Sequence, residues 1–281
     1  MKHKTTIGVD VGGTKMTSVL FSKGRVMADF TLATPKDNLE HFLIMLKALI
    51  DPLIEKAQKE KLKIGGIGIG IPGVVDERKE IVVKCRNLPI LNNVRLPDTL
   101  KEKFGLAVKI DNDANCFLRG EKNFGAGKKY NNALGITLGT GIGGAWWFNG
   151  DIYSGPHGGG FEPGRMIIDF KEPIDLEEAY HKLTLNNPLQ LAEEAHRGDV
   201  FARKAFEEFG LVLGLGLVDI VTIIYPEIIV IGGSVVESED LFMEKIKKTA
   251  KKYIVDPRAA KVKIIKGKLG PLAGAIGASL L

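Results

Sequence analysis

The sequence has few cysteines and no long apolar run. Cys85 and Cys116 are its only two cysteines among 281 residues, and neither has the spacing of a disulfide framework or a zinc site. The N-terminus lacks the apolar core of a signal peptide. The most apolar stretch, 211–224, carries Asp219 and ends at Pro226. These absences predict a cytoplasmic protein in a reducing compartment, with no membrane partner.

A strong charge bias is also lacking. The net charge is +5 with a pI of about 9.0, and the densest basic segment, 245–268, contains Tyr253 as its single aromatic residue. Without interleaved aromatic residues, this segment is interpreted as a solvated surface, and no nucleic-acid partner is predicted. The 44% hydrophobic and 26% charged residues are typical of a globular protein, and the length allows two lobes with their own cores.

A strand–turn–strand pattern occurs twice in the sequence. In segment 5–21, alternating apolar residues lead into Gly12-Gly13 and a second apolar run follows. Segment 133–147 repeats the pattern around Gly139-Thr140-Gly141. The repeat predicts two similar α/β halves that face each other and place both glycine turns at one central cleft.

Helical periodicity and strand-like apolar runs predict the remaining elements. The segment 37–59 is expected to be capped by Asp37, with Glu40 as the capping-box partner, and to be bent or interrupted at Pro52. Gly210, Gly214 and Gly216 disfavour a helix, so their presence within one predicts very close packing against it. The other predicted helices span 98–104, 113–124, 206–225 and 270–278, and the other strands span 64–71, 107–110 and 227–231.

Both glycine turns have the composition of a phosphate-binding turn. Backbone N–H groups converge on phosphate oxygens where no side chains obstruct them, although a single glycine turn is also common in β-hairpins. Neither turn has the closing Gly-Lys-Ser/Thr of a P-loop. Asp10, before the first turn, is interpreted as a magnesium-holding carboxylate, with a turn residue as the alternative. Lys15 either reaches a phosphate or is simply exposed.

Two other sites carry candidate catalytic or binding carboxylates. Asn112-Asp113 follows an apolar strand at the start of a helix. One interpretation is that these residues cap the helix, and the other is that Asp113 is a general base. Glu162 follows three consecutive glycines, 158–160, and either accepts hydrogen bonds from ligand hydroxyls or caps a turn. Local chemistry alone does not choose between these alternatives.

In their order along the chain, these motifs resemble the ROK family, a group of repressors, open reading frames and kinases. The resemblance covers nearly the whole chain. It is carried by Asp10-Val11-Gly12-Gly13-Thr14-Lys15, Gly70-Ile71-Pro72-Gly73, Asn87-Leu88-Pro89, Asn112-Asp113-Ala114-Asn115, Leu138-Gly139-Thr140-Gly141-Ile142-Gly143-Gly144, 226–233 and 270–278.

The resemblance implies a two-lobed α/β protein with the actin-like ATPase (ribonuclease H-like) fold and a central nucleotide cleft. The lobes would span 1–112 plus 268–281, and 113–267. The implied roles are general base for Asp113; sugar binding for Asn112, Glu162, Glu178, Gly73 and Arg165; nucleotide binding for Asp10, Gly12, Gly13, Thr14, Lys15, Gly139, Thr140, Gly141, Gly232 and Gly233; and magnesium binding for Asp10. Glu177 competes with Glu178 for one sugar-binding role.

The chain departs from the family pattern near Glu162. Arg165 stands where the family has the histidine of Glu-x-Gly-His, and 166–175 lacks the cysteines that bind zinc in the family. No zinc is therefore predicted. Arg165 either offers a cationic fork to the substrate or points away from the former zinc position.

The implied activity is that of an ATP- and magnesium-dependent sugar kinase acting on a hexose, most simply one like glucose, in a homodimer. The alternatives are an N-acetylhexosamine kinase of the N-acetylmannosamine type, a non-catalytic sugar or nucleotide binder, and a phosphohydrolase with water as acceptor. Family regulators carry a DNA-binding domain before the first phosphate motif, which begins here at Asp10, so a DNA-binding regulator is not expected.

Overall fold

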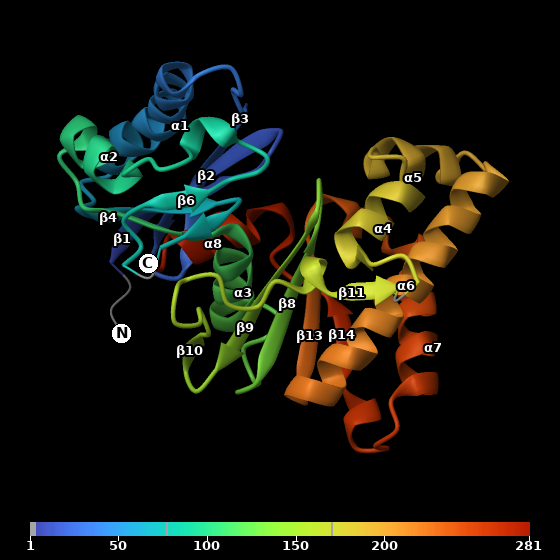
Figure 1. Ribbon diagram of the computed structural model, residues 1–281. Helices are drawn as coiled ribbons and strands as arrows, with labels where there is room; N and C mark the ends of the chain where they lie inside the picture. The colour runs from blue at the N-terminus through green and yellow to red at the C-terminus, as the bar shows by residue number, and fades with distance from the viewer. Residues whose placement is uncertain (1–3, 77, 170) are drawn as a thin grey trace.

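Two mixed five-stranded sheets organise the chain, as the computed structural model shows for residues 4–76, 78–169 and 171–281 (Figure 1). The first sheet has the order β3-β2-β1-β4-β7 and the second the order β10-β9-β8-β13-β14. The first sheet contains β1 (Thr5–Val11), β2 (Lys15–Ser22), β3 (Arg25–Ala33), β4 (Ile64–Ile71) and β7 (Val108–Asn112). The second contains β8 (Ala133–Leu138), β9 (Ile142–Phe148), β10 (Asp151–Ile152), β13 (Ile228–Gly232) and β14 (Lys263–Lys266).

The two sheets are built in the same way. In each, an antiparallel hairpin around a glycine turn comes first, β1–β2 in one and β8–β9 in the other. The first strand of each hairpin then pairs in parallel with a later strand, β1 with β4 and β8 with β13. The repeat predicted from the sequence is therefore confirmed as a repeat of topology.

Helices cover the sheets and connect their strands. They are α1 (Leu39–Lys59), α2 (Leu96–Phe104), α3 (Asp113–Phe124), α4 (Leu176–Leu183), α5 (Pro188–His196), α6 (Val200–Ile224), α7 (Met243–Tyr253) and α8 (Ala273–Ala278). Small two-stranded pairs are formed by β5 (Val74–Val75) with β6 (Val82–Lys84) and by β11 (Ile167–Asp169) with β12 (Ile174–Asp175). Short 3₁₀ turns lie at Pro89–Leu91, Pro163–Arg165, Ser234–Leu241, Ala259–Lys261 and Gly270–Leu272.

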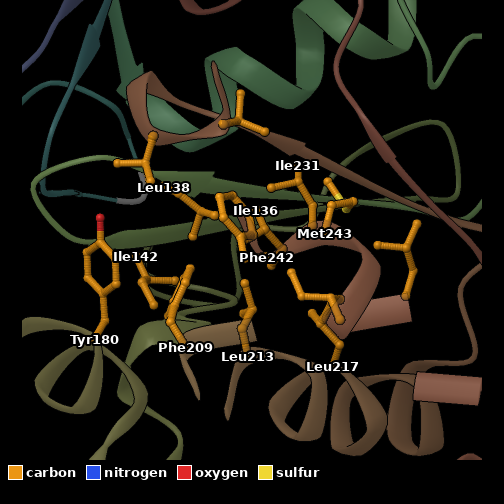
Figure 2. Close-up of a cluster of buried hydrophobic side chains, with 14 of the residues drawn as sticks. Ile136, Leu138, Ile142, Tyr180, Phe209, Leu213, Leu217, Ile231, Phe242 and Met243 are labelled. Atoms are coloured by element: carbon orange, nitrogen blue, oxygen red, sulfur yellow. The ribbon is translucent and has the colours of Figure 1, made fainter. Parts of the chain in front are cut away.

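Each half has its own apolar core. In the first half, α1 packs its buried face on the first sheet. In the second, Phe209, Leu213 and Leu217 of α6 face β8 and β13, which contribute Ile136 and Ile231 (Figure 2). Gly210 and Gly214 allow α7 to approach α6, because a Cβ on Gly214 would lie 2.7 Å from Cβ of Thr249. The predicted close packing at these helix glycines is confirmed.

The C-terminal helix α8 lies between the first sheet and α3 (Figure 1). A Cβ on Gly8 would lie 1.9 Å from the Ala275 carbonyl oxygen, and one on Gly277 would lie 1.7 Å from that of Cys116. The last residues of the chain therefore lie at backbone contact distance from both the first sheet and α3, while the lobe boundaries stay a prediction.

Two local predictions at helix ends were wrong, and of the two effects expected of Pro52 the interruption does not occur. Asn38 caps α1 by accepting the His41 backbone N–H at 2.8 Å, while Asp37 contacts the His41 ring instead. Pro52 does not interrupt α1, which stays a single helix over 21 residues because its buried residues on both sides of the proline pack on the sheet. α6 begins at Val200 rather than at 206, since Asp199 caps it at the Ala202 N–H. No helix in the described part of the chain is long and apolar enough to cross a membrane.

Candidate active site

The two glycine turns face each other across the two halves. Each is closed by a backbone hydrogen bond, from Gly12 N to Lys15 O at 2.9 Å and from Gly139 N to Gly141 O at 3.0 Å. A Cβ built on Gly13 would lie 3.4 Å from Thr140 Oγ1 of the opposite turn. The distance confirms the predicted approach of the two turns and leaves N–H groups of both halves around one cleft.

Two side chains of α4 contact backbone carbonyls of the second glycine turn. Tyr180 Oη donates to the Gly139 carbonyl at 2.8 Å, and the His181 ring contacts the Thr140 carbonyl at 2.8 Å. The buried Tyr180 ring packs into the second core (Figure 2). The position of the turn is thus coupled to the core of its own half, a role that sequence reasoning missed because Tyr180 gives no signal beyond that of a buried aromatic residue.

Asp10 lies at the end of β1, against α8. Its Oδ2 is 2.4 Å from where a Cβ on Gly274 would stand, so only glycine fits there. Burial raises the pKa of Asp10 to about 6, against the lowering effect of the nearby Lys15 charge. Within the described residues the Asp10 carboxylate has no hydrogen bond or ion pair, so it is a carboxylate short of positive charge.

This environment fits a magnesium ion. Hard oxygen ligands and uncompensated negative charge are what Mg²⁺ requires, and it commonly binds through only one or two carboxylates together with phosphates and water. No group of three or more His, Cys, Asp and Glu side chains arranged to hold a metal occurs in the described residues. The donor set therefore suits an ion carried largely by water and phosphate, and Asp10 is the residue that would hold it.

Asn112 and Asp113 stand where β7 passes directly into α3. Asn112 Oδ1 caps the helix, accepting from Ala114 N at 2.9 Å and Asn115 N at 3.2 Å, and its Nδ2 donates to the Gly73 carbonyl at 3.0 Å. The N-cap interpretation is confirmed for Asn112. The strand-to-helix junction holds the neighbouring Asp113 at a fixed position in the cleft.

The pKa of Asp113 is raised further than that of Asp10, another carboxylate of the cleft. Its Oδ1 accepts from Ala114 N at 2.9 Å. Burial is the largest cause that raises its pKa to about 8, and the charges of Asp10 and Glu162 add to the effect. A carboxylate with a pKa near neutrality can take up a proton at physiological pH, as a general base requires.

A small pocket joins several of the predicted sugar-binding residues. Gly73, Asn112 and Glu162 line it together, along with Val74, Asn115, Gly144 and the glycines 158–160. Burial raises the pKa of Glu162, the charge of Arg165 lowers it and that of Glu177 raises it. The pocket adjoins Asp113 through its neighbours Asn112 and Asn115.

Arg165 forms ion pairs and does not line this pocket. Its Nη1 donates to Asp175 Oδ2 at 2.9 Å and its Nη2 to Glu177 Oε1. These bonds tie the 3₁₀ turn Pro163–Arg165 to the start of α4. Arg165 is thus engaged by carboxylates of its own half, and both roles considered from the sequence stay predictions.

The structure places Glu177, rather than Glu178, at the cleft. Glu177 Oε2 accepts from Ile142 N at 2.9 Å and lies 2.3 Å from where a Cβ on Gly141 would stand. Arg86, from the first half, approaches Glu177 Oε1 at 3.5 Å. Glu178 is half-exposed and pairs with Lys182 on the same helix at 3.0 Å. Sequence reasoning missed Arg86, for which no motif gave a signal.

Gly232 and Gly233 lie beside the second glycine turn. A Cβ on Gly233, whose φ is 91°, would lie 2.2 Å from the Leu138 carbonyl oxygen. A Cβ on Gly232 would lie 2.2 Å from Cε2 of Phe117. Both positions therefore need glycine for packing, whatever they bind. Ser234 follows them, with its Oγ 3.8 Å from where a Cβ on Gly139 would stand.

Comparisons with known proteins agree with this arrangement. The sequence model of the ROK family matches residues 6–176 and 175–281. The chain belongs to the ROK family. Its match spans both sheets and every residue of the cleft described above.

Several ROK relatives match over the full length. A glucokinase from Thermotoga maritima is 28% identical over 97% of this chain and 95% of its own. An N-acetyl-D-glucosamine kinase from Mannheimia succiniciproducens is 30% identical over 98% of both chains. A xylose repressor from Bacillus spizizenii is 29% identical over 98% of this chain and 76% of its own.

A solved ROK structure has the same fold. The glucokinase from Streptomyces griseus, in complex with glucose and AMPPNP, superposes with a TM-score of 0.84 and 25% identity over 98% of each chain. The predicted α/β actin-like ATPase fold is thereby confirmed. The relatives include both kinases and repressors, so the chemistry of this chain depends on its own residues.

Proposed function

We propose that this ROK protein is an ATP-dependent sugar kinase that transfers the γ-phosphoryl group of ATP to a hydroxyl of a hexose, most simply one like glucose. One observation supports the proposal: the pKa of Asp113 is raised to about 8 by burial and by the charges of Asp10, which precedes the first glycine turn, and Glu162, which lines the pocket. A base in that position reaches both a phosphoryl donor and a hydroxyl acceptor.

In this mechanism the two glycine turns hold the phosphates of ATP by their N–H groups. Gly12, Gly13, Thr14, Lys15, Gly139, Thr140 and Gly141 form this cradle, and Gly232 and Gly233 border the nucleoside. Magnesium, which Asp10 would hold through water, supplies positive charge that neutralises the phosphate oxygens.

Asp113 then acts on the acceptor. It takes the proton of a sugar hydroxyl while the hydroxyl oxygen bonds to the γ-phosphorus and the bond to the bridging oxygen of ADP breaks. Asn112, Gly73 and Glu162 orient the sugar in the pocket that they line. Closure of the two halves excludes water, the competing acceptor.

Two further features define the sugar subsite in this proposal. Glu177, held by Arg165 and Arg86, is the second carboxylate that faces the cleft, in preference to Glu178. Arg165 serves the site by fixing Glu177. An N-acetylhexosamine acceptor is the alternative supported by the N-acetyl-D-glucosamine kinase relative. A non-catalytic binder or repressor is disfavoured by the intact Asp113 and by both phosphate turns.

The test is ADP release from magnesium-ATP with a panel of sugars. The panel contains glucose, mannose, fructose, allose, N-acetylmannosamine and N-acetylglucosamine, and Asp113→Asn is the matched control. We expect one sugar to support turnover that Asp113→Asn lowers by at least about 10²-fold, with nucleotide binding nearly unchanged. Turnover that survives in Asp113→Asn would refute the base assignment, and phosphate release without any sugar would identify a hydrolase.

A further inference from the structure

A second cavity lies at the outer edge of the first sheet, outside the cleft. Its volume is about 610 Å³, and it is bordered by the edge strand β7, by α2, by the turn between β5 and β6, by one residue of α3 and by the end of the chain. Cavities of a few hundred Å³ accommodate small metabolites. Its lining includes Arg78, Lys79, Glu80, Asp98, Lys101, Lys109, Arg119 and Leu281.

The described lining carries more positive than negative charge. Five of these side chains are cationic, Arg78, Lys79, Lys101, Lys109 and Arg119, and two are acidic. Both acidic residues already pair with Arg95, Glu80 at 3.0 Å and Asp98 at 2.8 Å. The surplus favours an anionic occupant.

Three of the cationic side chains keep free donors. Within the described residues, Arg78 and Lys101 have no ion pair or side-chain hydrogen bond. The Nε atom of Arg119 is buried and lacks a hydrogen-bond partner. An unsatisfied buried guanidinium N–H is costly, and the other two nitrogens of Arg119 pair with Asp111 at 3.0 Å and Asp151 at 3.2 Å. Guanidinium and ammonium donors together match the several oxygens of a phosphate group.

The cavity is connected to the cleft by one buried carboxylate. Lys79 Nζ and Arg119 Nη2 donate to Asp111 Oδ2 at 2.6 and 3.0 Å. The other oxygen, Oδ1, accepts from Asn112 N and from Asn115 Nδ2, each at 2.9 Å. Asp111 is only 2% exposed, so its charge depends on these donors. One carboxylate thus takes cations of the cavity on one side and holds two residues of the active-site pocket on the other.

We propose that this cavity is a binding site for a small phosphorylated anion, and that its occupation loosens the Asn112–Asn115 segment through Asp111. A phosphate group accepts from Arg78, Lys101, Lys79 and Arg119. The last two are then shared between the phosphate and Asp111, so they hold the Asp111 carboxylate less firmly. When Asp111 shifts, its hydrogen bonds to Asn112 and Asn115 weaken, and these two residues become more mobile. Asp113, which lies between them in the chain, then loses its fixed position. Only the effect on turnover rests on the proposed kinase function; binding does not.

Binding is tested by titrating the full-length protein with inorganic phosphate in a calorimeter. AMPPNP and magnesium are present in excess to occupy phosphate sites in the cleft. We expect the double variant Arg78→Ala with Lys101→Ala to bind phosphate at least about tenfold more weakly than the unaltered protein. Lys103→Ala, on the same helix but outside the cavity lining, is the matched control. Absence of phosphate binding, or equal losses in the control and the double variant, would overturn the proposed site.

Hydrogen exchange tests the connection to the cleft without requiring activity. We expect phosphate to accelerate amide exchange in peptides covering 111–118 at least about threefold, and to have no such effect in the double variant. Unchanged exchange with phosphate bound would overturn the role of Asp111. Glucose 6-phosphate and AMP in place of phosphate then distinguish a sugar phosphate from a nucleotide as the source of the phosphate group.

Turnover provides a third readout. With a sugar that supports ADP release, we expect phosphate to lower kcat several-fold in the unaltered protein but not in the double variant. Competition with ATP that persists in the double variant would show inhibition at the cleft and contradict the coupling. A chain with no turnover on any sugar, but with phosphate binding lost in the double variant, would count against the kinase proposal alone.

Discussion

At the scale of single residues, two carboxylates of the cleft, Asp10 and Asp113, form no ion pair within the described residues. Asp10 and Asp113 have pKa values raised to about 6 and 8, each mainly by burial. Asp111, which is also buried, instead has two cations on one oxygen. Uncompensated charge in the cleft costs stability, and such a cost is typical of a site prepared for ligands that bring positive charge or a proton.

The first prediction concerns the pH dependence of stability at Asp113. Its pKa is about 8 in the folded protein and near 3.8 when unperturbed. Between these values the folded state binds more protons than the unfolded state, so the free energy of unfolding decreases as the pH rises from about 4 to 8. Asp113→Asn removes this loss. Because part of the side chain keeps contact with water in the cleft, we expect a gain on the order of 1–2 kcal/mol at pH 8.

Denaturant unfolding of the ligand-free protein at pH 5 and pH 8 measures this effect. The gain from Asp113→Asn should be larger at pH 8 than at pH 5. Asp29→Asn, on the exposed strand β3, is the control and should change the free energy of unfolding by less than about 0.5 kcal/mol. An equal or smaller gain at pH 8 would contradict the raised pKa of Asp113.

The second prediction separates Glu177 from Glu178. Glu177→Gln removes the charge that binds Arg165 and approaches Arg86, next to the second glycine turn. We expect it to lower kcat/KM for the accepted sugar at least about tenfold. Glu178→Gln should change kcat/KM less than about twofold, because Glu178 pairs with Lys182 at the surface. Steady-state kinetics of both variants decides, and the opposite ranking would assign the subsite to Glu178.

At the scale of elements, the position of α8 depends on glycines that permit backbone contact. Gly8, Gly68 and Gly120 each bring a neighbouring element so near α8 that a Cβ would meet a carbonyl oxygen within 2.4 Å. Gly274 leaves room for the Asp10 carboxylate. The C-terminal helix therefore supports the first sheet and α3 together, and also lies against Asp10 of the cleft.

The third prediction follows from this packing. Gly277→Ala would place a methyl group 1.7 Å from the Cys116 carbonyl oxygen, and backbone on both sides prevents easy relief. We expect a loss of about 2–3 kcal/mol in the free energy of unfolding. Gly65→Ala is the control, because the nearest atom beyond its chain neighbours would be 3.5 Å away. Thermal and urea unfolding of both variants measures the difference. A Gly277→Ala protein as stable as the control would mean that α8 can shift freely.

At the scale of the whole molecule, ligands are expected to join the two halves. The glycine turns come from different sheets, and Arg86 and Glu177 approach each other from different halves. An ATP molecule held by both turns adds contacts that the unfolded chain cannot make. Ligand binding to the folded state alone raises its apparent stability by mass action.

The fourth prediction uses this linkage to test the magnesium proposal. AMPPNP with magnesium should raise the Tm by several degrees, and EDTA should remove most of the increase, because in the proposed site Asp10 would reach the nucleotide only through the ion. In Asp10→Asn we expect a much smaller effect of magnesium on the Tm. Differential scanning calorimetry measures both proteins. If EDTA leaves the Tm increase of the unaltered protein unchanged, the magnesium site is contradicted. Sedimentation of the same samples tests the expected homodimer.

The sequence by itself determined the fold class and the repeated hairpins, and it named the candidate residues of the cleft. Strand alternation and glycine turns are local signals, because each reflects a backbone conformation that residues adjacent in the chain adopt together. Asp10, Asn112, Asp113 and Glu162 are therefore identified as candidates by the residues that flank them, while their roles follow only from the family resemblance. Helix ends were harder to predict, as at Asn38 and Asp199, because several polar residues compete for one cap within a few positions.

Only the tertiary structure decided which neighbours of these residues matter. Glu177 and Glu178 are adjacent and chemically alike, and the rotation of α4 alone places one in the cleft and the other in solvent. Arg86 and Gly274 gain their significance from partners far away in the sequence. Such contacts depend on packing between elements, which local sequence patterns do not encode.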